Sequence, residues 1–234
     1  MSAAGVPGAP GGLRAGQLGV IVIGRVIMGD IAVTLADLAQ RKLLIVSETG
    51  DDGDWLLRPS AGIVPGREQS PLLGYEKRLL DGLTDVGARS RLSALAGEFG
   101  AALDDTREAL VREAVHQGWL RHMHHDQRTR EGDDLALQVR SFSRDLRRLK
   151  ADGGKEALAG ALLPYALHFG LIPDEQTPLA RFAHAWVRAF ADQPGWAPPK
   201  PKRAEFDDPI APATDPGDRM LHQMGTAAFL MGAM

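Results

Sequence analysis

Apolar residues recur at helical spacing in several segments of the chain. In residues 29–42, Ile31, Leu35 and Leu38 fall at positions i, i+4 and i+7, which places them on one face of a helix. The same pattern predicts further helices over residues 75–83, 92–99, 105–119, 135–150, 156–169 (interrupted near Pro164) and 177–190. Asp105 and Glu108 have the spacing of a capping pair, so one of these helices is expected to begin at Asp105.

A β-hairpin is predicted directly after the first helix, over residues 43–57. Two short β-rich runs there flank a turn cluster of glycine and aspartate. A helix followed by a two-stranded hairpin is the second half of a winged helix. In such a unit, Leu35 and Leu38 would be buried against the strands around Leu44 and Ile45.

The helices over residues 75–119 repeat this theme and close on an apolar Gly-Trp-Leu step. We therefore predict a mainly α fold with short β-hairpins, built from tandem winged-helix-like units that are followed by a helical C-terminal region. The predicted division is a flexible lead over residues 1–12, unit 1 over 13–60, unit 2 with a basic helix over 72–150, a helical region over 151–192, and a Pro-rich linker with an apolar tail over 193–234.

Composition and charge exclude several classes of site. The chain has 27 Lys and Arg against 30 Asp and Glu, a net charge of −3, which argues against a generally basic nucleic-acid binder. It has no cysteine, so disulfides, thiolate nucleophiles and zinc–thiolate sites are excluded. Neither a signal peptide nor a run of ~20 apolar residues is present, so we expect a cytoplasmic protein without membrane insertion.

Three blocks of the sequence, in the same order, resemble the soluble part of the YciQ-like predicted membrane proteins of bacteria. The first is Leu13–Val46, the second is Tyr75–Leu83 ("YEKRLLDGL"), and the third is Leu162–Leu171 ("LLPYALHFGL"). In the first block the matching residues are Gly24, Arg25, Val26, Asp30, Ile31, Ala32, Thr34, Leu35, Asp37, Leu38 and Ala39. The soluble region of that family is a domain of unknown function, so the resemblance implies a fold and no activity.

The chain departs from that family between the second and third blocks. The family generally has a transmembrane hairpin there, whereas this chain has Arg121–Asp134, "RHMHHDQRTREGDD". Ten of these fourteen residues are Arg, His, Asp or Glu, which a bilayer interior does not accept. The chain therefore resembles a soluble derivative of the cytoplasmic face of such a protein.

One helix face is a candidate for contact with a protein or a nucleic acid. Within the predicted helix over residues 135–150, Arg140, Arg144, Arg147 and Arg148 share a face. Gln40 and Arg41, at the end of the first helix, are further candidates. The hairpin beside that helix is acidic, and its carboxylates (Glu48, Asp51, Asp52 and Asp54) would repel phosphate. An ordinary solvated helix remains the plain alternative for the arginine-rich face.

A metal site and an enzyme have less support in the sequence. His122 and His125 have the i, i+3 spacing that a helix could place on one face, but no zinc pattern is completed nearby. The glycine patterns of dinucleotide and phosphate loops are absent, and so is the G-x-S-x-G elbow. We predict no cofactor and no catalytic residue, and an enzyme is the less favoured interpretation.

The C-terminal tail has the composition of a docking segment. Leu221, Met224, Phe229 and Leu230 lie in a methionine-rich apolar stretch after the Pro-rich linker. They would dock on a partner, or alternatively on an apolar patch of the chain's own fold.

The sequence as a whole favours a non-enzymatic cytoplasmic adaptor or binding module that contacts a protein or peptide through winged-helix surfaces. The first alternative is a DNA-binding transcription regulator that uses the arginine-rich helix. The second is an accessory subunit of an enzyme complex. The oligomeric state is left open.

Overall fold

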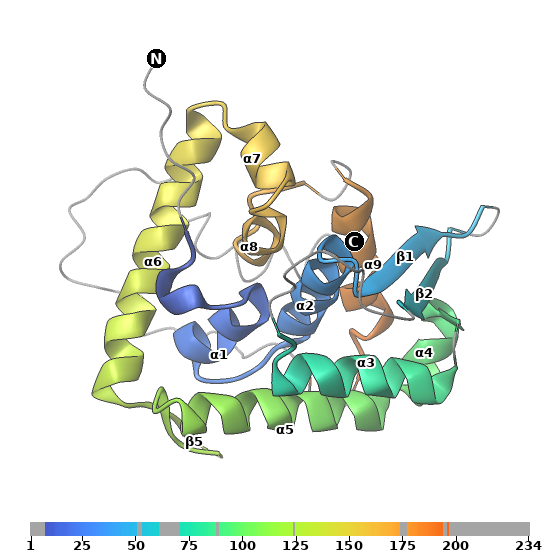
Figure 1. Ribbon diagram of the computed structural model, residues 1–234, viewed down its shortest axis with the longest axis horizontal. Helices are drawn as coiled ribbons and strands as arrows, with labels where there is room; N and C mark the ends of the chain where they lie inside the picture. The colour runs from blue at the N-terminus through green and yellow to red at the C-terminus, as the bar shows by residue number, and fades with distance from the viewer. Residues whose placement is uncertain are drawn as a thin grey trace.

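The computed structural model describes residues 8–50, 53–60, 71–87, 89–123, 125–173, 177–193 and 196. In these residues the chain is mainly helical, with one antiparallel sheet of three strands and one of two (Figure 1). The predicted class, mainly α with short β-hairpins, is confirmed. No helix of the described residues is both long enough and apolar enough to cross a bilayer.

The N-terminal part forms two 3₁₀ turns, Pro10–Gly12 and Ala15–Gln17, and helix α1, Leu18–Ile23. Residues 10–12 of the predicted flexible lead are thus in a turn. Gly24 ends α1 with a φ of 83°, a left-handed conformation that glycine adopts without strain. The apolar run before Gly24 is therefore helical, and it is not the strand of a nucleotide-binding unit.

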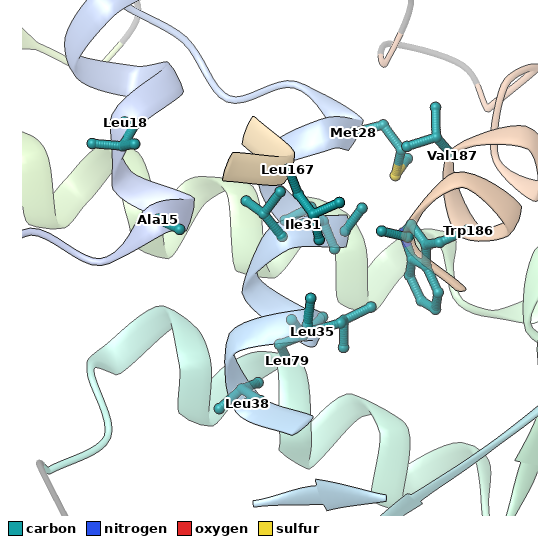
Figure 2. Packing of buried hydrophobic residues seen from close by; sticks show 14 of the residues in the cluster. Ala15, Leu18, Met28, Ile31, Leu35, Leu38, Leu79, Leu167, Trp186 and Val187 are labelled. Atoms are coloured by element: carbon teal, nitrogen blue, oxygen red, sulfur yellow. The ribbon is translucent and has the colours of Figure 1, made fainter. Parts of the chain in front are cut away.

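Helix α2, Met28–Gln40, lies in the centre of the core. Every residue of α2 except Asp37 and Gln40 is buried. Helices α8, Leu163–His168, and α9, Pro178–Ala189, pack against it, and so does the turn Ala15–Gln17. Figure 2 shows side chains from α3, α8 and α9 gathered around α2, among them Leu79, Leu167, Trp186 and Val187. A helix covered on so many sides needs apolar residues around most of its circumference.

The first sheet joins parts of the chain that the sequence assigns to different units. Strand β1, Leu44–Glu48, pairs with β2, Trp55–Pro59, and β2 pairs with β3, Ser90–Arg91. The predicted burial of Leu35 and Leu38 is confirmed, and α2 contacts β1. The two strand residues named in that prediction differ from each other. Leu44 is buried, whereas Ile45 is 40% exposed, because successive side chains of a strand point to opposite faces.

Helices α3, Gly74–Val86, α4, Leu92–Glu98, and α5, Gly100–His116, form the second group, and α3 packs along α5. The expected start of the third helix at Asp105 is wrong, because α5 begins five residues earlier, directly after Phe99. The buried positions Leu103 and Thr106 continue the apolar face toward the N-terminus, and Asp105 is an exposed residue inside the helix. A two-stranded hairpin follows, with β4 at Leu120–His122 and β5 at His125–Arg128.

Helix α6, Arg130–Ala151, forms one side of the molecule (Figure 1). It begins five residues before the predicted start, because Thr129 Oγ1 accepts a hydrogen bond from Gly132 N at 3.0 Å and caps the first turn. Helix α7, Lys155–Ala159, and α8 are separate, as the predicted interruption near Pro164 implies. The tail residues Leu221, Met224, Phe229 and Leu230 lie outside the described residues.

Candidate interaction surfaces and buried charges

Helix α6 turns an apolar face to the core and a basic face to solvent. Val139 and Leu146 are fully buried. Arg140, Arg144 and Arg148 are exposed on the other side, while Arg147 is partly buried at its margin. Arg140, Arg144 and Arg148 follow one another at intervals of four residues, so their side chains form a row along the helix.

A leucine belongs to the same exposed row. Leu137 is 59% exposed, more than any other large apolar side chain in the part of the chain that the structure describes. It precedes Arg140 by three residues and Arg144 by seven, and this spacing places it on the same face. We call Leu137, Arg140, Arg144 and Arg148 the α6 basic face.

Few carboxylates neutralise the α6 basic face. Arg148 Nη1 lies 3.6 Å from Asp145 Oδ1, which is a long distance for an ion pair. Among the described residues no carboxylate pairs with Arg140 or Arg144. The N-terminal end of α6 is mixed in charge: Glu131, Asp133 and Asp134 are exposed there, but so is Arg130, and Arg128 Nε lies 2.8 Å from Asp133 Oδ1.

Gln40 and Arg41 lie elsewhere, and both are held by the fold. Gln40 Nε2 donates to the carbonyl of Gly160. Arg41 Nη1 lies 2.6 Å from Glu76 Oε1 and 3.0 Å from Asp37 Oδ2. The structure therefore does not bring these two residues together with the α6 basic face.

Arg41 belongs to a buried network that sequence reasoning missed. The side chain of Glu76 has no exposed surface, and its Oε2 accepts from Leu73 N at 2.9 Å, which caps the start of α3. Burial lowers the pKa of Arg41, but the hydrogen bonds and charges of Glu76 and Asp37 outweigh it and leave that pKa raised. The network thus links α2 to α3 across the segment between the two predicted units. The only signal in the sequence was one basic residue at the end of a predicted helix, Arg41, and one acidic residue at the start of the next, Glu76.

Two further groups beside this network have perturbed pKa values. Burial raises the pKa of Glu113, and the charge of Glu76 adds to this, although Gln17 Nε2 donates to Glu113 at 2.8 Å and opposes the shift. Burial also raises the pKa of Tyr75 well above its usual value, again with a contribution from Glu76. A phenol in this state stays protonated at neutral pH, so it is a poor proton acceptor for catalysis.

A second buried carboxylate lies at the start of α2. Asp30 has no exposed surface, and its Oδ2 accepts from Ile27 N at 2.9 Å. Its Oδ1 lies 3.4 Å from Nδ1 of His168, the last residue of α8. A His–carboxylate pair is part of many catalytic triads, but here the pair is buried between packed helices. The sequence signal was an aspartate in the first turn of a mostly apolar helix.

The outer edge of β1 has no strand partner among the described residues. Thr49 N donates to Asp54 O, and Ser60 N donates to Leu43 O, so the odd-numbered residues of β1 bond to β2. Antiparallel pairs alternate between bonded and non-bonded positions, so the N–H and C=O of Val46 point away from β2. Within the described ranges no strand pairs with this edge of β1.

The two candidate metal ligands lie in strands and not in a helix. His122 of β4 and His125 of β5 are register partners in the second hairpin. The described residues contain no group of three His, Cys, Asp or Glu side chains that could hold a metal ion. The helical i, i+3 arrangement considered from the sequence is therefore wrong.

Comparison with known proteins adds no relative to this picture: no protein-family model, no curated protein and no solved structure matches the chain.

Proposed function

We propose that this chain is a non-enzymatic binding module that holds an extended segment of a protein partner on the outer edge of β1. The observation that carries the proposal is the outward direction of the Val46 backbone groups on an edge with no described strand partner. An extended peptide satisfies such groups by adding a strand, and alternate side chains then give specificity.

The side chains of β1 are compatible with strand addition. The strand reads Leu-Ile-Val-Ser-Glu, and it lacks the proline and lysine with which many proteins block an exposed edge. Ile45 is 40% exposed on the outer face, where an added strand would place an apolar side chain beside it. Glu48 is held by Arg181 of α9 at 2.9 Å, which keeps the end of the strand in place.

The proposal has three further parts: the fold consists of tandem winged-helix-like units, the protein is cytoplasmic, and it is related to the YciQ-like family. The order α3, β3, α4, α5, β4, β5 is the helix–strand–helix–helix–hairpin order of a winged helix, and α1, α2, β1 and β2 repeat its second half. The pairing of β3 with β2 is a departure, because β3 then serves the first hairpin and not the second. The three blocks of family likeness fall on α1–β1, α3 and α8.

A DNA-binding regulator has less support. Helix α2 cannot enter a major groove, because it is buried on nearly all sides. The arginine-rich helix α6 is then the candidate for that function, and it has the exposed carboxylates of Glu131, Asp133 and Asp134 at its N-terminal end. On the outer face of α5, Arg107 pairs with Asp104 and Arg112 pairs with Glu108, while Asp105 is exposed. That face therefore has no basic row for phosphate contacts.

A substitution at Val46 tests the proposal. Peptides are selected from a random display library on the full chain, and their affinity is measured by titration. Val46→Pro removes the outward N–H without touching the bonds from β1 to β2, so we expect a loss of affinity of about tenfold or more. Because the Val46 side chain is partly buried against the core, the melting temperature should fall as it does in Val46→Ala, which keeps the N–H and should keep the affinity. Ile45→Thr is the side-chain control, and a smaller loss is expected from it. Selected peptides that bind Val46→Pro as tightly as the parent, or a library that yields no binder, would contradict the proposal.

A further inference from the structure

We propose that the α6 basic face is a second docking surface and that its occupant is an acidic segment of a protein with one apolar side chain. The surface is independent of the β1 edge. It consists of Leu137, Arg140, Arg144 and Arg148, which are exposed along α6.

Charge complementarity identifies the occupant as acidic. Residues 140–150 contain five bases and one acid, Asp145, which lies 3.6 Å from Arg148. Arginine binds carboxylates through two parallel N–H donors, which gives it geometric as well as electrostatic preference for them. The side chains of Arg140 and Arg144 have these donors available to a partner.

The spacing of Arg140, Arg144 and Arg148 indicates how acidic side chains are spaced in the partner segment. Residues four apart on a helix are separated by about 6 Å along its axis, so Arg140 to Arg148 covers about 12 Å. Carboxylates at positions i, i+4 and i+8 of a partner helix have the same spacing. An apolar side chain one turn away from the acidic cluster then reaches Leu137, whose exposed surface is otherwise unfavourable.

Two features favour an acidic protein segment over a nucleic acid. A polyphosphate that continued along α6 past Leu137 would meet the exposed carboxylates of Glu131, Asp133 and Asp134. The bases Arg128 and Arg130 lie beside these three carboxylates and leave a small net negative charge, which disfavours phosphate, whereas a short acidic segment that ends at Leu137 avoids it. An exposed leucine also contributes nothing to a phosphate contact, but it is a usual anchor for an amphipathic helix.

The experiment uses the full chain and a synthetic helical peptide with glutamates at i, i+4 and i+8 and a leucine one turn before them. We expect the triple variant Arg140→Gln, Arg144→Gln, Arg148→Gln to lose about tenfold or more of the affinity measured by fluorescence anisotropy. The matched control is Arg58→Gln, Lys77→Gln, Arg112→Gln, which removes the same charge from exposed residues elsewhere and should retain the parent affinity. Leu137→Ser should weaken binding on its own.

Three results would overturn the proposal. The first is an equal loss of affinity in the control triple, which would mean that only net charge matters. The second is unchanged binding by Leu137→Ser. The third is a random-sequence DNA duplex that binds the parent more tightly than the peptide at the same salt concentration. Val46→Pro should leave peptide binding to α6 intact, so failure of this proposal is distinguishable from failure of the proposed function.

Discussion

Among single residues, Tyr75 and Tyr165 make a matched pair of partly or wholly buried phenols. The hydroxyl of Tyr75 is buried and has no hydrogen-bond partner in the described part of the chain. The hydroxyl of Tyr165 donates to Leu13 O at 2.7 Å. A buried hydroxyl without a partner costs desolvation free energy, whereas a bonded one contributes about 1 kcal/mol of stability.

Replacing each phenol tests this difference. At neutral pH, Tyr75→Phe should be as stable as the parent or up to about 1 kcal/mol more stable, while Tyr165→Phe should lose about 1 kcal/mol. Urea unfolding of both variants measures the change. A loss in Tyr75→Phe as large as that in Tyr165→Phe would mean that the Tyr75 hydroxyl has a partner.

The pH dependence of the same variants follows from the direction of the pKa shift. Burial raises the pKa of Tyr75 in the folded chain, so folding favours its neutral form. That contribution is complete below the pKa of the unfolded chain, about 10, and is lost as the pH rises from there toward the folded pKa. Between about pH 8 and pH 11 the parent should therefore lose more stability than Tyr75→Phe.

At the scale of elements, a glycine fixes how α6 begins. A Cβ on Gly132 would lie 2.0 Å from the carbonyl oxygen of Trp119, a backbone atom that cannot turn aside. We expect Gly132→Ala to lower the free energy of unfolding by about 3 kcal/mol, although alanine is the better helix former. The control is Gly97→Ala in α4, where nothing lies near the added carbon and a gain of about 0.5–1 kcal/mol is expected. Equal effects in the two variants would show that helix propensity alone decides.

The elements differ in how far the sequence predicts them. Helix α2, the first hairpin and α9 were predicted because an apolar stripe or a turn cluster marks each one locally. The start of α6 was missed because its first turn is polar and is specified by the cap at Thr129. Strand β3 has two residues and therefore no periodicity, so its pairing with β2 depends on contacts that sequence pattern does not contain.

The candidate surfaces also differ in whether a local sequence pattern predicts them. The arginine row on α6 was predictable because four charges at helical spacing need only the helix to become neighbours. The roles of Gln40 and Arg41 were not, because their partners Gly160 and Glu76 lie 120 and 35 residues away in the chain. A glutamine and an arginine at the end of a helix have the same appearance in a sequence whether they face solvent or the core.

For the whole molecule, the core is one connected cluster that includes residues of α1 through α9. Helix α9 holds its parts together: Phe182 lies 5.5 Å from Trp55 of β2, and Trp186 lies 5.9 Å from Phe99, between ring centroids. We therefore expect calorimetry of the full chain to show one unfolding transition whose calorimetric and van't Hoff enthalpies agree. A chain that ends at Ala151 should show no cooperative transition. Two separable transitions in the full chain would contradict this expectation.

The central place of α2 has a consequence for how the chain is made. Leu163, the first residue of the helix pair that covers α2, comes 123 positions after Gln40. At a synthesis rate of about 5–20 residues per second, the apolar surface of α2 leaves the ribosome roughly 6 to 25 s before its cover does. During that interval the turn Ala15–Gln17 and strand β1 can already cover part of α2, but the apolar side that packs against α8 and α9 stays exposed. The yield of this protein should therefore depend strongly on chaperones that bind apolar segments during translation.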